Sequence, residues 1–465
     1  MIPCALTALW YSEFTAFFSF IKTITVMALI SIPVIFFTRK ISTKKPDIRD
    51  GFLLVSLSWL TISLFASIPF RLSDSLPTWA DAFFEASSGI STTGATVIND
   101  LEIVNKSILL WRSVTHWIGG MGIVVLSVAL FPLLGIGGVQ IMRAETSGVS
   151  DQKLAPRITQ TAKFLWLIYT GFTLIAFVFL KSGGMSTFDA VNHAFSSVAS
   201  GGFSTRNASI GYYDSEYLNW VIVCIVCAAG ISFSLYYKIF TGKLKAVLRN
   251  TELKAYLSVI IATGFIIAFI NYRQNIYTDI KTSICYSFFH VTSIITSAGF
   301  SAGDYRVWPN LSQFILFGLF FIGGCAGSTA GGFKVIRMVI LLKHALTELR
   351  KMIHPRGVFM LRINGQSVNK DTAYSVSGFL FLYISFIIIV SCIAATADVD
   401  IVTAFSTGLS LVGNVGPAFG DVGPAMTYAF YPEYVKWTLG LAMIAGRLEI
   451  YAFFILFTPF FWKRL

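Results

Sequence analysis

The chain has 465 residues, of which 55% are hydrophobic and only 12% are charged, and its mean hydropathy is +0.72. This composition excludes a soluble globular domain, and apolar stretches near the roughly 20 residues that cross a bilayer recur from end to end. The net charge of +12 lies in blocks of Lys and Arg between apolar segments, which excludes a nucleic-acid-binding face and is typical of cytoplasmic loops.

Five basic blocks divide the sequence, and they comprise residues 39–49, 143–163, 238–254, 334–370 and 463–464. If all five lie in the cytoplasm, each interval between them must leave and re-enter that side of the membrane. An interval of about 80 to 100 residues is longer than two helices of roughly 20 residues require. We therefore expect an additional element in the outer half of every interval.

These intervals predict an N-terminal region and four larger units. Residues 1–49 contain one clear membrane span, at residues 14–38, and a basic loop. The four units that follow comprise residues 50–142, 143–237, 238–353 and 354–465.

One short glycine motif falls within each unit, and the four motifs align on Gly94, Gly202, Gly299 and Gly416. The intervals between these glycines are 108, 97 and 117 residues, which is far longer than a solenoid period and fits a whole membrane unit. A polar residue stands nine positions before each glycine in an otherwise apolar or small-residue stretch, and these residues are Glu85, His193, His290 and Thr407. We interpret Glu85, His193 and His290 as buried hydrogen-bonding groups in preference to metal ligands or proton relays.

The stretch of about 13 residues before each glycine is too short to cross a membrane and predicts a re-entrant half-helix. Such a half-helix directs its partly negative C-terminal end at the glycine motif, and four converging ends attract a cation. Non-helical backbone at membrane depth must be packed in protein or line water. The expected fold is therefore an all-α integral membrane protein, with four pseudo-symmetric units of helix, re-entrant pore loop and helix around one central pore.

Glycine at four equivalent positions suits a selectivity filter, because rings of carbonyl oxygens replace the hydration shell of a cation and no Cβ crowds the axis. We assign the ion-binding filter to the three residues that end at each aligned glycine. These residues are Thr92, Thr93, Gly94, Ser200, Gly201, Gly202, Ser297, Ala298, Gly299, Asn414, Val415 and Gly416. Gly201 is an alternative to Gly202. We prefer Gly202 because it aligns with Gly299, the residue before Phe300. Close helix packing, the other use of membrane glycines, is preferred for Gly119, Gly120 and Gly122.

A second glycine-rich segment, residues 323–332, interrupts a predicted helix of the third unit. It contains Gly323, Gly324, Gly327, Gly331 and Gly332. Each glycine costs a helix up to about 1 kcal/mol, and the five together do not stay on one helix face as a packing surface would require. The segment therefore predicts an intramembrane gating loop across the pore.

Arg447 lies in the last predicted helix with apolar residues on both sides. A charge at membrane depth costs roughly 2.5 to 3.5 kcal/mol unless it has a partner or water, although an arginine near a helix end can snorkel to the interface. We expect carbonyl oxygens of the glycine loop to hold the guanidinium, and the two together to obstruct cation passage at rest.

These segments carry a resemblance to a known family. They read FFEASSGISTTGAT, WIGGMGIVVL, KLAPRITQTAK, SSVASGGFST, SIITSAGFS, GGCAGSTAGGFKVIR, GNVGPAFG and AGRLEIY. Over nearly its whole length the chain resembles the Trk/Ktr/HKT superfamily of potassium transporters, and within it the bacterial Trk membrane subunits. Two helices usually precede the first unit in that family, and residues 1–11 here resemble the end of the first of them.

The resemblance implies potassium uptake across the cell inner membrane by a multi-pass protein, with potassium ions as substrate at the filter and no covalently bound cofactor. It also implies a homodimer in membrane lipid and a cytosolic, nucleotide-binding regulatory subunit of the TrkA type. In this superfamily, glycine at all four filter positions accompanies potassium preference and serine at the first accompanies sodium, and the first residue here is Gly94. The family position of Arg447 is beneath the filter, near a gating loop.

Two alternatives are weighed against this reading. A sodium-coupled or sodium-permeable relative of the Ktr/HKT type would be distinguished by its first filter residue. A membrane-embedded enzyme is disfavoured, because the sequence contains no HExxH or P-loop motif. Channel-like conduction and symport coupled to protons or sodium both fit the sequence.

Overall fold

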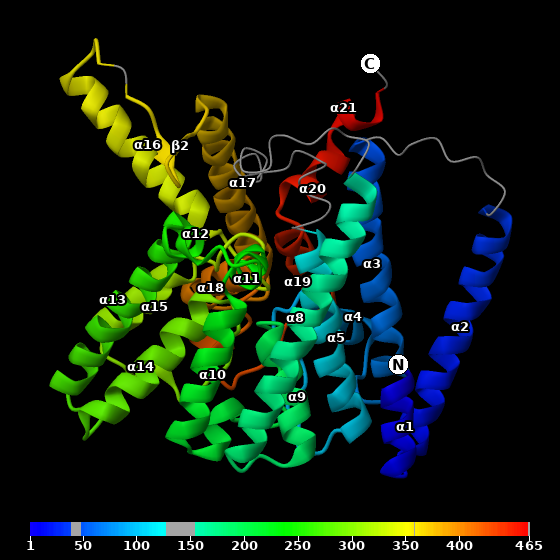
Figure 1. Ribbon diagram of the computed structural model, residues 1–465. Helices are drawn as coiled ribbons and strands as arrows, with labels where there is room; N and C mark the ends of the chain where they lie inside the picture. Colours follow the sequence, from blue (N-terminus) through cyan, green and yellow to red (C-terminus); the bar gives the residue numbers. More distant parts are fainter. Residues whose placement is uncertain (39–47, 127–153, 358, 464–465) are drawn as a thin grey trace.

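A computed structural model of the chain describes residues 1–38, 48–126, 154–357 and 359–463, and Figure 1 shows a bundle of helices. Within these ranges, six helices are long and apolar enough to cross a membrane. They are α2 (Phe14–Thr38), α3 (Ile48–Leu72), α5 (Lys106–Val125), α8 (Leu154–Ser182), α13 (Thr251–Arg273) and α17 (Lys370–Ala395). The protein is therefore a multi-pass membrane protein.

Four shorter helices follow the first long helix of successive units. These half-helices are α4 (Trp79–Ile90), α9 (Thr187–Val198), α14 (Ile280–Ile295) and α18 (Ile401–Gly413). Side chains at the N-caps of three of them accept backbone hydrogen bonds from the first turn, and these residues are Thr78, Ser186 and Asp400. After each half-helix the chain turns back as non-helical backbone. The predicted fold class, helix, re-entrant loop and helix repeated four times, is confirmed.

The second helix is interrupted in three of the units. In the second unit, the chain bends by 87° between α10 (Glu216–Ala229) and α11 (Phe233–Phe240). In the fourth unit, it bends by 113° between α19 (Glu433–Arg447) and the segment Tyr451–Phe457. In the third, α15 (Asn310–Leu319) is separated by the glycine-rich segment from α16 (Val335–Ile353). Residues that continue the first unit beyond α5, and its boundary with the second at 142–143, lie outside the described ranges.

A short antiparallel hairpin joins α16 to α17. Its strands are β1 (Arg362–Ile363) and β2 (Gln366–Ser367), with Arg362 opposite Ser367. Asn364 and Gly365 have φ angles of 50° and 82°, as the tight turn between right-twisted strands requires. Figure 1 shows α16 projecting from the helix bundle at the same end as the C-terminus.

The remaining elements are short. They are α1 (Ile2–Trp10), α12 (Leu244–Leu248), α20 (Tyr451–Phe454), α21 (Pro459–Trp462), η3 (Ser209–Tyr213), η4 (Tyr305–Val307), η5 (Gly420–Val422) and η6 (Ile455–Phe457). Helix α1 packs against α2 and α5. The predicted basic blocks 39–49 and 143–163 fall largely outside the described residues.

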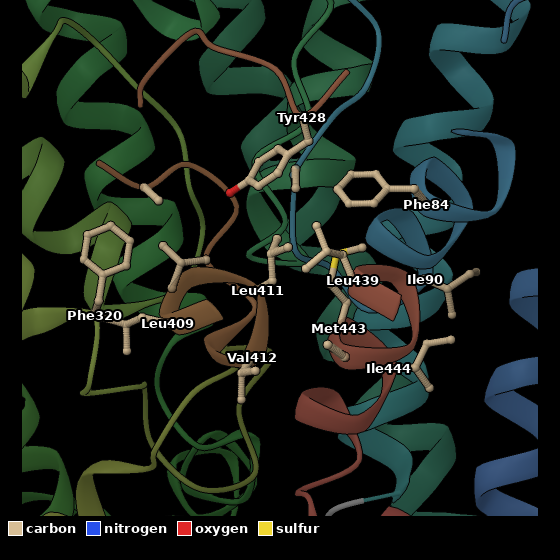
Figure 2. Packing of buried hydrophobic residues seen from close by; sticks show 14 of the residues in the cluster. Phe84, Ile90, Phe320, Leu409, Leu411, Val412, Tyr428, Leu439, Met443 and Ile444 are labelled. Carbon is tan, nitrogen blue, oxygen red and sulfur yellow. The ribbon is translucent and has the colours of Figure 1, made fainter. Parts of the chain in front are cut away.

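Buried apolar side chains fill the space around the half-helices. Figure 2 shows Leu411 and Val412 of α18 near Leu439 and Met443 of α19, with Phe84 of α4 beside Tyr428; all are buried. Gly119 allows α5 to pack directly against the C-terminal end of α4, because a Cβ on this residue would lie 1.9 Å from the carbonyl oxygen of Ile90. The re-entrant backbone is thus surrounded by protein and not by lipid, as its unpaired polar groups require.

Candidate functional site

The four half-helices end with the same pair of backbone hydrogen bonds. In each, the residue before the aligned glycine donates its N–H to a serine carbonyl five residues earlier, at 2.8–2.9 Å. The pairs are Thr93 with Ser88, Gly201 with Ser196, Ala298 with Ser293, and Val415 with Ser410. The preceding residue, Thr92, Ser200, Ser297 or Asn414, donates to a carbonyl three residues earlier. These are Schellman motifs, which turn the chain sharply at the end of a helix.

The turn residue of each motif adopts a left-handed backbone conformation that is normally taken by glycine. Its φ angle is 53° in Thr92, 53° in Ser200, 52° in Ser297 and 56° in Asn414. Such a conformation costs a non-glycine residue on the order of 1–3 kcal/mol and is concentrated at functional sites. Repetition of the same strain in four units marks these turns as a shared site.

The four aligned glycines form a closed ring. Their φ angles are positive, at 83° for Gly94, 84° for Gly202, 70° for Gly299 and 96° for Gly416. A Cβ on Gly94, Gly202 or Gly299 would lie 2.1 Å from a carbonyl oxygen of the next unit, and one on Gly416 would lie 2.4 Å from that of Thr93 in the first. Since real Cβ atoms do not approach within 3.0 Å, no other residue fits these positions unless the neighbouring backbone moves.

The carbonyl that each glycine meets belongs to the residue just before the aligned glycine of the next unit. The four contacts run from Gly94 to Gly201, from Gly202 to Ala298, from Gly299 to Val415 and from Gly416 to Thr93. The second position of the ring is thus Gly202. A Cβ on Gly201 would instead meet the ring of His116, at 2.2 Å from Nδ1.

The polar residues nine positions before the glycines hold the returning segments. Glu85 accepts hydrogen bonds from the Thr96 hydroxyl and the Val97 N–H, both at 3.0 Å. His193 Nε2 lies 2.9 Å from Ser204 Oγ, and His290 Nε2 lies 3.0 Å from the Gly303 oxygen. Thr407 contacts the Tyr431 hydroxyl at 3.0 Å. These side chains thus act as hydrogen-bonding supports of the returning segments.

A buried ion pair of the first unit lies behind the ring, and its arginine also binds the second unit. Arg112 Nε lies 2.7 Å from Glu85 Oε1, with side chains 2% and 0% exposed. Arg112 also donates to the Ser204 oxygen at 3.0 Å and covers the ring of Phe203. Sequence reasoning identified Glu85 and overlooked Arg112, although an arginine between apolar residues of a predicted span is itself a functional signal.

The other neighbouring units are joined on the outer side by direct hydrogen bonds. Gly211 N–H donates to the Ser301 oxygen at 3.1 Å, and Tyr428 N–H donates to the Thr96 oxygen at 2.8 Å. The Tyr305 hydroxyl donates to the Ala418 oxygen at 2.7 Å. A small recess of about 80 Å³ opens above the ring, lined by residues that include Gly94, Gly202, Gly299 and Pro417. Hydrogen bonds therefore join every pair of neighbouring units around the ring, and the recess gives access to it.

One ion pair beside this surface links the third and fourth units. Asp304 and Arg306 form an ion pair at 2.8 Å, and hydrogen bonds from the guanidinium hold the pKa of Asp304 below its usual value. Arg306 also donates to the Gly420 oxygen at 3.2 Å. This pair therefore stays ionised at neutral pH and links the third and fourth units.

The glycine-rich segment lies directly against the inner side of the ring. Gly331 N–H donates to the Ser297 hydroxyl, and Thr329 Oγ1 lies 2.9 Å from Ser200 Oγ. A Cβ on Gly331 would lie 2.7 Å from the Gly413 oxygen. The segment thus interrupts the second helix of the third unit, as expected, and contacts the turn residues of two units.

Arg447 is buried at the end of α19 and faces the same segment. It lines a void of about 20 Å³ together with Gly327, Gly331, Gly332 and Lys334, which is room for about one water molecule. The expectation that loop carbonyls hold its guanidinium is wrong. Within the part of the chain that the structure describes, Arg447 Nε, Nη1 and Nη2 have no hydrogen-bond partner.

Other donors occupy two of the loop carbonyls that were expected to bind Arg447. Lys334 Nζ donates to the Ala330 oxygen, and Phe233 N–H donates to the Gly327 oxygen at 2.9 Å. The neighbouring carboxylate, Glu449, pairs with Arg337 of α16. The guanidinium of Arg447 therefore places a positive charge in the void beneath the ring.

A family model described as TrkH, cation transport protein, matches residues 18–464. The Trk system potassium uptake protein TrkH of Salmonella typhimurium is 39% identical over 420 residues, which cover 90% of this chain and 86% of that protein. The Trk system potassium uptake protein TrkG of Escherichia coli K12 is 35% identical over 466 residues, which cover 100% of this chain and 95% of that protein.

The fold agrees with a solved structure of this family. The crystal structure of the potassium transporter TrkH from Vibrio parahaemolyticus superposes with a TM-score of 0.90 at 34% identity, covering 99% of this chain and 96% of that chain. The chain therefore belongs to the TrkH family of cation transport proteins.

Proposed function

We propose that the protein takes up potassium ions across the cell inner membrane as the membrane subunit of a Trk-type system. The closed ring of Gly94, Gly202, Gly299 and Gly416 is the observation that supports this function best. With glycine at every position the ring presents backbone and no side chains, and backbone carbonyls are the groups that replace the hydration shell of potassium. Two relatives that are named potassium uptake proteins align with 90% and 100% of the chain.

The ion-binding filter comprises the four three-residue turns that end in these glycines. Each turn follows the C-terminal end of a half-helix, whose dipole favours a cation. The first ring position, Gly94, carries no side chain, which supports a preference for potassium over sodium. Residues 50–142, 143–237, 238–353 and 354–465 contribute one turn each.

The glycine loop and Arg447 form the closed gate. Gly323, Gly324, Gly327, Gly331 and Gly332 allow the loop to cross beneath the ring, where a Cβ on Gly323 would lie 2.1 Å from the Gly331 oxygen. The void left between the loop and Arg447 is about 20 Å³, too small for a hydrated ion, and a buried guanidinium repels cations electrostatically. Opening requires both elements to move.

The basic stretch that includes α16 and the hairpin faces the cytosol and binds a nucleotide-binding regulatory subunit of the TrkA type. Arg350, Lys351 and Arg356 lie in this stretch, near the end of a helix that projects from the bundle (Figure 1). The protein acts as a homodimer in membrane lipid, which contacts exposed apolar side chains such as Phe36 of α2 and Phe381 of α17.

Rescue of a potassium-uptake-deficient bacterium on low-potassium medium tests this function. Expression of the chain with a TrkA-like subunit should restore growth, and a Gly94→Val variant should not, because its side chain cannot fit against Gly201. Potassium flux in liposomes containing the purified protein and no other substrate separates a transporter from an enzyme. Failure of the wild-type chain in both assays would refute the proposal.

A further inference from the structure

Glu252 holds the glycine loop at two points. It lies in the first turn of α13 and is buried. Its Oε1 atom accepts hydrogen bonds from the N–H of Ala326 at 2.7 Å and from the N–H of Ile336 at 3.2 Å. These two donors are on opposite sides of residues 327–332, so one oxygen atom fixes both ends of the segment that contacts the ring.

A carboxylate is suited to this position. Ile336 is in the first turn of α16, where backbone N–H groups have no partner within the helix and where the helix dipole favours a negative charge. Hydrogen bonds to an ionised group are roughly twice as strong as those between neutral groups. Without Glu252, both N–H groups would be buried and unpaired, and the loop would lose its attachment to α13.

The residue before Glu252 is bound to the cytoplasmic hairpin. Thr251 N–H donates to Asn364 Oδ1 at 2.7 Å, and Asn364 N–H donates to Thr251 Oγ1 at 3.3 Å. The hairpin is also bound to α16, since Lys343 Nζ donates to the Arg362 oxygen at 2.8 Å. An exposed turn is thus connected to the loop through two adjacent residues.

We propose that Glu252 is the positioning residue that keeps the glycine loop in its obstructing conformation, and that Asn364 transmits movement of the cytoplasmic surface to it. This inference rests on the proposed gate. Displacement of the hairpin shifts the first turn of α13, which withdraws the carboxylate from Ala326 and Ile336. The loop then loses its two hydrogen bonds to α13 and is freer to leave the inner side of the ring, while the backbone hydrogen bonds within the four filter turns remain.

Potassium flux in liposomes, measured with the purified chain and no partner subunit, tests this role. We expect Glu252→Ala to raise resting flux about tenfold, because it removes charge-assisted hydrogen bonds, without changing the potassium to sodium permeability ratio. Glu252→Gln keeps an acceptor oxygen and should restore most of the wild-type obstruction. Glu433→Ala is the control, since Glu433 is also in the first turn of a long helix but is exposed, and its flux should equal that of the wild type.

A second variant keeps the test informative if Glu252→Ala misfolds. Asn364 is exposed, so Asn364→Ala leaves the core intact and should raise resting flux several-fold. Unchanged flux in both variants would overturn the role of Glu252. A deletion of residues 328–330 separates this result from failure of the gate. If the deletion raises flux and the two substitutions do not, only the positioning role of Glu252 is refuted. If none of the three variants raises flux, the gate is refuted as well.

Discussion

Arg112 and Glu85 form an ion pair of 2.7 Å that is shielded from solvent and ties the backbone of two units together behind the glycine ring. Glu85 holds Thr96 and Val97 of its own unit, and Arg112 holds the carbonyl of Ser204 in the next. The backbone around the ring is therefore held by a charge pair that lies behind it. Loss of this buried pair should therefore lower the stability of the protein more than loss of a surface pair does.

Replacement of Arg112 by Ala should lower the stability of the detergent-solubilised protein by about 3–5 kcal/mol, because Glu85 would remain buried without its partner. Thermal unfolding followed by fluorescence measures the change. Arg71→Ala is the control, since Arg71 pairs with Asp74 at 3.5 Å and the side chains are 34% and 84% exposed; its loss should be about 0–1 kcal/mol. Equal unfolding temperatures for the two variants would contradict this role of the pair.

Replacement of Arg447 by Ala should increase potassium flux in the absence of a partner subunit, because it removes the positive charge from the void beneath the ring. An increase of about tenfold corresponds to a barrier lowered by about 1.4 kcal/mol. Flux into liposomes loaded with a potassium-sensitive dye measures it. Arg447→Lys should keep flux low, and Arg273→Ala, an exposed arginine of α13, should have no effect. If Arg447→Ala stays at the resting level of the wild type, the arginine has only a structural role.

The side of the membrane occupied by α16 can be checked with cysteine labelling. Lys351→Cys should react with a membrane-impermeant maleimide only after the cells are made permeable, because basic stretches remain in the cytoplasm. Ile103→Cys should react in intact cells, since Ile103 lies on the opposite, outer side and is 81% exposed. Labelling of position 351 from outside would invert the topology and exclude cytosolic docking at this stretch.

The ring and its half-helices were predictable because their signals are local and repeated. Gly94, Gly202, Gly299 and Gly416 recur in register with polar residues nine positions earlier, and short apolar stretches before them cannot span a bilayer. The serines six positions before each glycine, Ser88, Ser196, Ser293 and Ser410, share that register. They were overlooked as a signal because their carbonyls, and not their side-chain chemistry, close the turns.

Long-range partners were not predictable from the same signals. Nothing in the sequence near Glu85 shows that Arg112 binds it, and Glu252 lies more than 70 residues before the loop N–H groups that it holds. The partner expected for Arg447 was wrong for a related reason. Which carbonyls of a loop are available depends on every donor around it, and here Lys334 and Phe233 occupy two of them.

The potassium to sodium permeability ratio of Gly94→Ser tests the central claim most directly, with Gly171→Ala as control. A Cβ at position 94 would lie 2.1 Å from the Gly201 oxygen, so serine must displace a carbonyl of the ring, whereas a Cβ at Gly171 in α8 meets nothing within 4 Å. Reversal potentials under bi-ionic gradients should show the ratio lowered about tenfold in Gly94→Ser, or about 1.4 kcal/mol of differential stabilisation, and unchanged in Gly171→Ala. A wild-type ratio in a correctly inserted Gly94→Ser protein would contradict the assignment of the glycine ring as the filter.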